Sequence, residues 1–148
     1  MPSECLECLI GATRVEVPLA EVERLLEYQA APPPPLAHPW LGGIGVADKE
    51  DLFLSVSLSG DTSAAPRAVR GLLFRRSERR VRWALEVDRV VGLRKVEEED
   101  GVHPVNGWAC PPEWLLRGRD DGGGDVARLD VKAAERTLGQ SRGVEAPS

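Results

Sequence analysis

The chain has 148 residues, 42% hydrophobic and 29% charged, which is enough for one soluble domain with a sizeable core. A net charge of −5 argues against a general nucleic-acid binder, and no apolar run reaches the roughly 18 residues that a membrane-spanning helix needs. The 15 glycines and 12 prolines favour short strands and turns over a helix bundle. With three cysteines and no signal-peptide pattern, we expect a cytoplasmic protein.

The N-terminal segment predicts a β-hairpin followed by a helix. Residues 4–10 alternate weakly and residues 14–17 alternate polar and apolar side chains, so both predict strands, joined by a turn at Gly11. Pro18 cannot donate to a strand ladder and suits the first turn of a helix. Leucine and valine then recur at helical spacing, which predicts a short amphipathic helix over residues 19–28.

The middle of the chain predicts a series of strands. Residues 40–46 contain two apolar patches broken by glycines, and residues 52–58 alternate cleanly. Residues 59–67 are polar and predict a loop. Residues 69–74 and 81–87 predict a second hairpin, joined by a charged turn.

The C-terminal part predicts one more hairpin and a helix. The acidic run at residues 97–100 predicts a connecting segment. Residues 114–116 and 126–131 predict two strands on either side of a glycine-rich turn. Residues 132–138 predict a short helix, and residues 140–148 lack an apolar pattern and are expected to be disordered.

Short strands at regular spacing predict a mostly β barrel or sandwich. Three segments, residues 11–25, 84–92 and 129–132, resemble CheW-type chemotaxis coupling domains in composition, order and spacing. The resemblance covers residues 4–139. It implies two small SH3-like, five-stranded β-barrels, packed together and carrying short helices.

The same resemblance implies an adaptor without catalytic chemistry, metal or cofactor, located in the cytoplasm at chemoreceptor arrays. Its partner would be the cytoplasmic tip of a methyl-accepting chemoreceptor; binding to a CheA-type histidine kinase or to other CheW-like proteins stays open. In the family, a groove between the barrels binds the receptor. The residues at the corresponding positions are Leu19, Val22, Leu25, Gly43 and Val90.

Four positions depart from the family pattern near the surface where it meets the kinase. Arg24 stands where glutamate is common, and Asp48 and Lys49 end a segment that is Asn-Leu-Arg-Gly in the family, so that Asp48 replaces its arginine. Ser57 replaces an aspartate, and the loop at residues 59–67 is too short for the usual helix. Since reversed charges weaken an interface, we expect weak or absent binding to the kinase.

Two other functions were weighed on the residues alone. The five arginines of residues 75–82 could grip phosphates, which makes a nucleic-acid-binding β-barrel the alternative function. Cys5 and Cys8 have the spacing of half a zinc site, but a closed site needs a second pair of ligands. Because the chain offers no such pair, we expect no metal.

Overall fold

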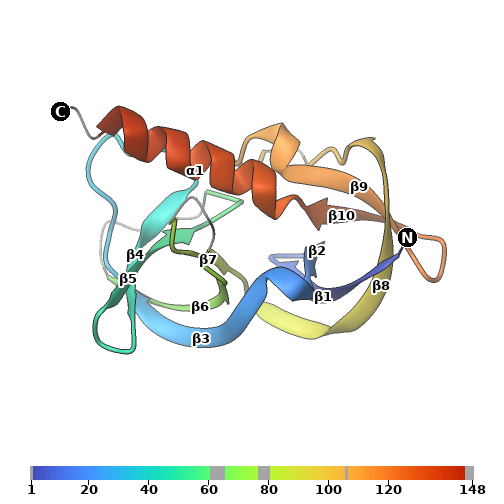
Figure 1. Ribbon diagram of the computed structural model, residues 1–148, viewed down its shortest axis with the longest axis horizontal. Coiled ribbons are helices and arrows are strands. Elements are labelled where there is room, and N and C mark those ends of the chain that lie inside the picture. The colour runs from blue at the N-terminus through green and yellow to red at the C-terminus, as the bar shows by residue number, and fades with distance from the viewer. Residues whose placement is uncertain (1, 61–65, 77–80, 106, 146–148) are drawn as a thin grey trace.

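The described part of the chain folds into two five-stranded β-units and one α-helix (Figure 1). This computed structural model describes residues 2–60, 66–76, 81–105 and 107–145, the last five without their side chains. The first unit, barrel 1, is a closed ring of strands in the order β1-β2-β10-β9-β8. These strands are β1 (Ser3–Ile10), β2 (Thr13–Pro18), β8 (Arg89–Val102), β9 (Leu115–Asp120) and β10 (Asp125–Leu129).

The second unit, barrel 2, is a five-stranded sheet in the order β3-β6-β7-β5-β4. Its strands are β3 (Val22–Ala30), β4 (Leu41–Ala47), β5 (Asp51–Val56), β6 (Arg67–Phe74) and β7 (Trp83–Glu86). Just beyond β3, the backbones of Ala31 and Ile44 exchange two hydrogen bonds of 2.8 and 2.9 Å, which join the two edges of the sheet. The predicted mostly β fold with two five-stranded units is confirmed.

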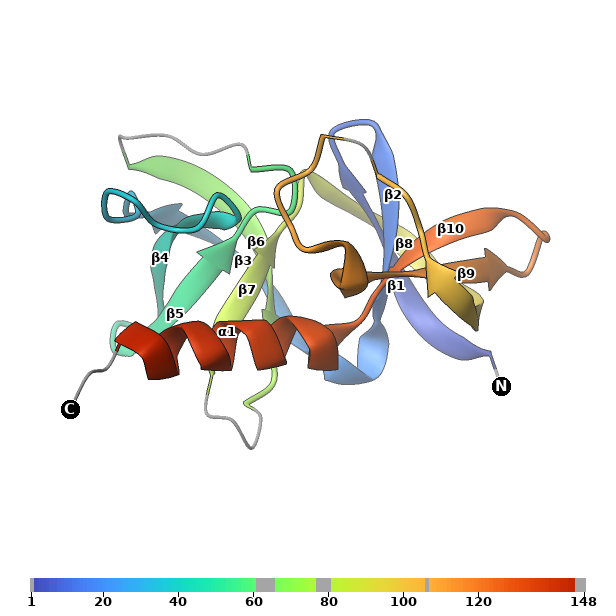
Figure 2. The same cartoon turned by 90° about the horizontal axis from the view of Figure 1, so that it is seen from above.

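The helix α1 (Val131–Glu145) connects the two barrels. It follows β10 of barrel 1 and lies along barrel 2, as Figure 2 shows from above. The Trp83 indole on β7 donates to Glu135 at 3.1 Å, and the Trp114 indole in η2 (Pro112–Trp114) donates to Thr137 at 3.2 Å. None of the helices in the described ranges is long and apolar enough to cross a membrane.

The predicted helix over residues 19–28 is wrong. Only η1 (Leu19–Glu21) is helical there, and β3 follows it directly. Partly buried Leu26 and Tyr28 alternate with exposed neighbours, which is the period of a strand. Since β3 pairs with β6 along its whole length, backbone hydrogen bonds to a distant segment outweigh the local helical spacing.

Two further segments differ from the prediction. The acidic run at residues 97–100 is not a connection but part of β8, where it pairs with β9. The helix α1 continues to Glu145, whereas the pattern predicted a helix only over residues 132–138 and disorder from residue 140. Both predicted hairpins agree with the structure: β1 pairs with β2 around the Gly11 turn, and β6 pairs with β7.

Candidate docking site

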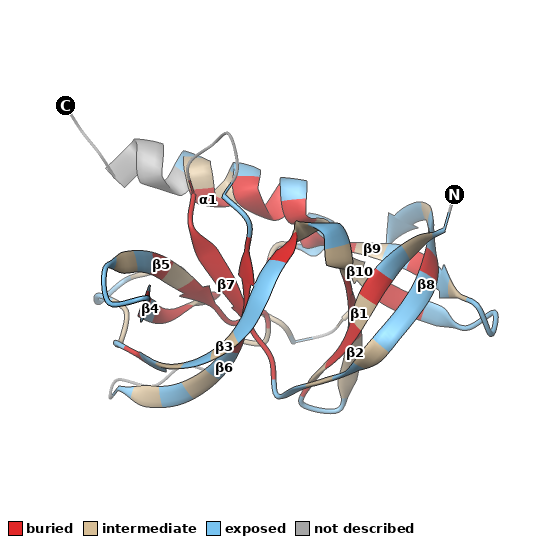
Figure 3. Cartoon of the chain, turned by 60° about the horizontal axis from the view of Figure 1, so that its bottom comes forward, coloured by how far each residue is buried: buried red, intermediate tan, exposed pale blue. Residues whose placement is uncertain are grey.

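Three of the five predicted groove residues lie along one edge where the barrels meet. In Figure 1, η1, β3 and the start of β8 run along the lower edge, and Figure 3 turns this edge toward the viewer and shows the exposed face of β3. Leu19 is half-buried, Leu25 is 47% exposed, and Val90 is half-buried against the main hydrophobic cluster. Leu25 pairs with buried Leu72 of that cluster. This apolar strip is the groove edge.

The other two predicted groove residues have structural roles. Val22 is only 7% exposed and belongs to the main hydrophobic cluster. Gly43 has a φ of 148°, and a Cβ there would collide with the Ala31 carbonyl oxygen. Gly43 therefore allows the close approach that joins the edges of barrel 2. A larger residue at either position is expected to disturb the fold before it disturbs a partner.

The two charges that depart from the family pattern form an ion pair with each other. The Arg24 Nη2 donates to Asp48 Oδ2 at 2.6 Å, joining β3 to the turn between β4 and β5. Both side chains are exposed, at 41% and 70%. Since the resemblance placed an acid at the first position and an arginine at the second, the pair is retained with its charges exchanged. The reversal is therefore compensated within this chain.

The remaining two divergent positions do not share a surface. Lys49 is exposed in the β4–β5 turn, where it adopts a left-handed backbone with φ of 74°. Ser57 is 4% exposed and follows β5, at the opposite end of that strand from the turn. A six-residue strand spans about 20 Å. The expectation that the changes act together at one surface is wrong for Ser57, because β5 separates it from Asp48.

The described arginines of the predicted basic hairpin are paired. Arg82 is 8% exposed, and its guanidinium donates to both carboxylate oxygens of Glu23 at 3.0 and 2.8 Å, to Asp51 at 3.0 Å and to the Phe74 carbonyl at 2.6 Å. The hydrogen bond from Arg82 lowers the pKa of Glu23. Arg76 donates to Asp51 at 2.8 Å. These cations bind the strands of barrel 2 together; two of the five arginines lie outside the described residues.

The cysteines are buried in separate places. Cys5 and Cys8 are both fully buried, Cys5 in a small cluster inside barrel 1 and Cys8 in the main cluster. Burial raises the pKa of Cys8 to about 12 and that of Cys110 to about 11, so both remain thiols at neutral pH. Among the residues described, no group of three or more His, Cys, Asp or Glu could hold a metal ion.

A cleft of about 1010 Å³ lies between the two barrels, and no pattern in the sequence indicated it. Its walls come from the β1–β2 turn, the end of β3, the start of β6 and the segment after β7, together with Trp108. No predicted groove residue lines it, although Leu25 and Val90 each lie two residues from a lining residue in the chain. Cleft and groove edge are thus neighbouring but different surfaces.

A buried polar chain forms part of the cleft wall. The hydroxyls of Tyr28 and Ser55 lie 2.7 Å apart, and Ser55 donates to Glu86 Oε2 at 2.6 Å. The Arg67 Nη2 lies 2.8 Å from both oxygens of Glu86 and donates to the Gly42 carbonyl at 3.1 Å. Burial raises the pKa of Tyr28, so its hydroxyl stays protonated. This chain carries no nucleophile with an adjacent base, and the site is suited to binding.

Comparison with solved structures identifies the architecture. The chain is similar to the scaffolding protein TtCheW from Thermoanaerobacter tengcongensis, with a TM-score of 0.62 and 12% identity over 88% of this chain and 86% of that one. The chain has the CheW fold. The expected pair of barrels in this CheW-like protein is thereby confirmed, although no protein-family model and no curated protein matches it. At 12% identity, the likeness concerns the fold.

Proposed function

We propose that this CheW-like chain is a non-enzymatic adaptor in a cytoplasmic chemoreceptor array, where it binds the tip of a methyl-accepting chemoreceptor. The observation that carries the proposal is the groove edge on a CheW fold: Leu25 is an exposed apolar side chain on β3, next to the junction with barrel 1. An amphipathic helix binds such a surface by burying its own apolar face. Leu19 and Val90 would extend the contact on either side.

The receptor contact can be tested with a charge on the groove edge. A receptor cytoplasmic fragment would be titrated calorimetrically into the wild type, Leu25→Glu and Val90→Glu, with thermal melts to verify folding. We expect at least tenfold weaker binding in each folded variant, because a buried unpaired carboxylate is strongly unfavourable. Leu52→Glu is the matched control, since Leu52 is a 64% exposed leucine outside the groove edge. Unchanged affinity in folded Leu25→Glu would remove the groove edge from the site.

Binding to a CheA-type kinase is proposed to depend on the exchanged ion pair. A kinase regulatory domain of the family-typical kind would face reversed charges at Arg24 and Asp48 and bind weakly, whereas a domain with matching exchanges would bind. The test compares wild type with the double variant Arg24→Glu/Asp48→Arg on a family-typical kinase domain. We expect the double variant to bind more tightly. Equal affinities would show that the pair does not select the partner.

A further inference from the structure

The electrostatics of the inter-barrel cleft indicate what it can bind. Glu86 is 8% exposed, and both of its carboxylate oxygens accept hydrogen bonds from Arg67 or Ser55. Arg67 differs, since all of its bonds to described residues come from Nη2. Its side chain is 25% exposed, and it lines the cleft. The Nε and Nη1 groups of Arg67 are therefore available as positively charged donors beside a carboxylate that is already satisfied.

A second arginine stands on the same strand of the cleft wall. Arg70 is 41% exposed and donates through Nη1 to the Asp88 carbonyl at 3.3 Å and through Nη2 to Glu27 at 2.9 Å. Its first bond is long and its second is to an exposed acid, so both can be exchanged for a ligand at little cost. Two guanidinium groups from residues 67 and 70 thus reach one cleft. Guanidinium groups bind carboxylates by paired, charge-assisted hydrogen bonds.

The cleft also offers apolar contact to the rest of a ligand. Trp108 and Ile10, which come from different barrels' connecting segments, line it together with Val69. Its volume of about 1010 Å³ lies at the upper end of the range for small-molecule sites, which is about 300–1,000 Å³. Space of this size between two barrels suits a short extended peptide with alternating acidic and apolar side chains.

We propose that the inter-barrel cleft binds an extended, carboxylate-bearing segment of a partner protein, with its carboxylate held by Arg67 and Arg70 and an apolar side chain against Trp108. The occupant is taken to be a protein segment because the proposal rests on the adaptor function proposed above. The cleft is a second docking surface, separate from the groove edge. An adaptor with two such surfaces can hold two partners at once.

The test is a heteronuclear NMR titration of the full chain with a capped pentapeptide of alternating glutamate and leucine. We expect shifts at the Trp108 indole and at the backbone amides of residues 67–70, and at least tenfold weaker binding of the same peptide with glutamine in place of glutamate. Arg70→Gln should weaken binding of the glutamate peptide about tenfold. Arg67→Lys, which keeps a positive charge beside Glu86, should do the same while the protein stays folded.

The controls separate this proposal from the receptor contact. Leu25→Glu should leave peptide binding unchanged even if it abolishes receptor binding, so the two proposals fail independently. Equal binding of the glutamate and glutamine peptides, or shifts confined to residues outside the cleft, would overturn the proposal. So would unaltered affinity in both arginine variants. If free glutarate bound as tightly as the glutamate peptide, the site would be one for small dicarboxylates, and the peptide assignment would be wrong.

Discussion

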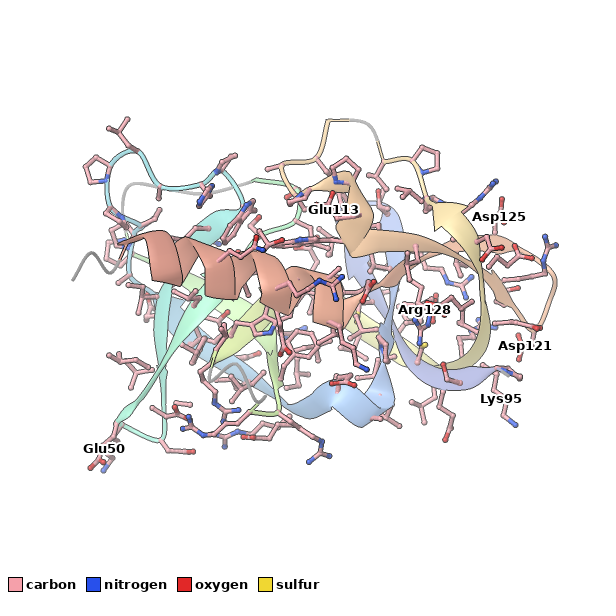
Figure 4. All side chains as sticks on the ribbon, turned by 45° about the horizontal axis from the view of Figure 1, so that its top comes forward. Glu50, Lys95, Glu113, Asp121, Asp125 and Arg128 are labelled. Atoms are coloured by element: carbon pink, nitrogen blue, oxygen red, sulfur yellow. The ribbon has the colours of Figure 1, made fainter. Side chains whose placement is uncertain are left out.

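The two barrels have the same number of strands but fill their interiors differently. In barrel 1, Val15 and Val17 pack outward into the main cluster, so Glu16 between them points inward. Glu7 pairs with Glu16 across β1 and β2, and Arg128 pairs with Glu16 across β2 and β10, so these side chains share the interior. Figure 4 shows Arg128 among the strands of barrel 1 and Glu50 at the far end of barrel 2.

The interior of barrel 1 is an ion network beside a small apolar cluster. Arg14 lies 2.5 Å from Glu16 and 2.9 Å from Asp120, yet Arg14 Nη2, Glu16 Oε1 and Arg128 Nε are buried without a hydrogen-bond partner among the described residues. Burial, the largest influence, raises the pKa of Glu16. The apolar share of this interior is a cluster of three residues: Cys5, Val96 and Val126. Barrel 1 thus depends on charge pairing that is not fully satisfied.

The interior of barrel 2 is instead fitted around aromatic rings. Tyr28 and Phe53 meet edge to face with ring centroids 4.8 Å apart. A Cβ on Gly45 would overlap the Phe53 ring, and one on Gly71 would lie 2.7 Å from the Tyr28 hydroxyl. Glycines on the neighbouring strands therefore make room for the two rings. The comparison shows that one fold can stabilise equivalent barrels by ion pairing or by aromatic packing.

The largest expected effect comes from breaking the ion network of barrel 1. Arg14→Met leaves fully buried Glu16 without its cation, which should cost about 3 kcal/mol of unfolding free energy at pH 7. The loss should shrink toward the unfolded-state pKa of Glu16, because the carboxyl is then neutral in both states. Chemical denaturation across pH measures it. Arg117→Met is the control: its 3.6 Å pair with Asp125 is about half exposed, and an equal loss there would contradict the prediction.

The next effect concerns the aromatic interior of barrel 2. Gly45→Ala forces the Phe53 or Tyr28 ring to move and should cost about 2 kcal/mol. Gly92→Ala on β8 is the matched control, because a Cβ there meets nothing within 4 Å. Denaturant melts of both variants provide the measurement. Similar stabilities would mean that the rings of barrel 2 adapt more readily than its close packing indicates.

The two barrels should respond to pH with opposite slopes, a smaller effect than the two above. The pKa of Glu16 is raised in the folded protein, so stability falls as pH rises from the unfolded value of about 4.5 through the folded pKa. The pKa of Glu23 is lowered, so its contribution is present above about 4.5 and is lost as pH falls through the folded pKa.

Glutamine variants resolve the two slopes. Glu16→Gln should flatten the loss of stability toward neutral pH, and Glu23→Gln should flatten the loss toward acid. The measurement is unfolding free energy from about pH 3 to pH 7, the window in which glutamate carboxyls titrate. If both variants flattened the same limb, the assignment of opposite shifts to the two barrels would be wrong.

The smallest expected effect concerns the exchanged ion pair at the surface of barrel 2. Arg24→Glu and Asp48→Arg should each cost less than about 1 kcal/mol, because the pair is exposed. The double variant should recover most of that loss, since it restores an attractive pair with the opposite polarity. A double-mutant cycle by denaturation measures the coupling. Additive losses would show that the 2.6 Å contact contributes nothing to stability in solution.

The sequence determined the features that depend on local chemistry. Alternating side chains and turn residues predicted the β1–β2 and β6–β7 hairpins, and three separated motifs together predicted the CheW fold. The groove edge was found only in part: Leu25 and Val90 are accessible or half-buried, whereas Val22 is core. Burial of one residue depends on what packs over it, which spacing along the chain does not contain.

Only the tertiary structure decided the features made by segments distant in sequence. Residues 22–30 became a strand because β6 supplies the hydrogen-bond partners, against a local helical spacing. Arg24 and Asp48, two separate anomalies in the sequence, became one ion pair because β3 passes the β4–β5 turn. The cleft likewise exists only between two finished barrels. Pairings across a fold depend on chain topology, and local propensity carries no record of them.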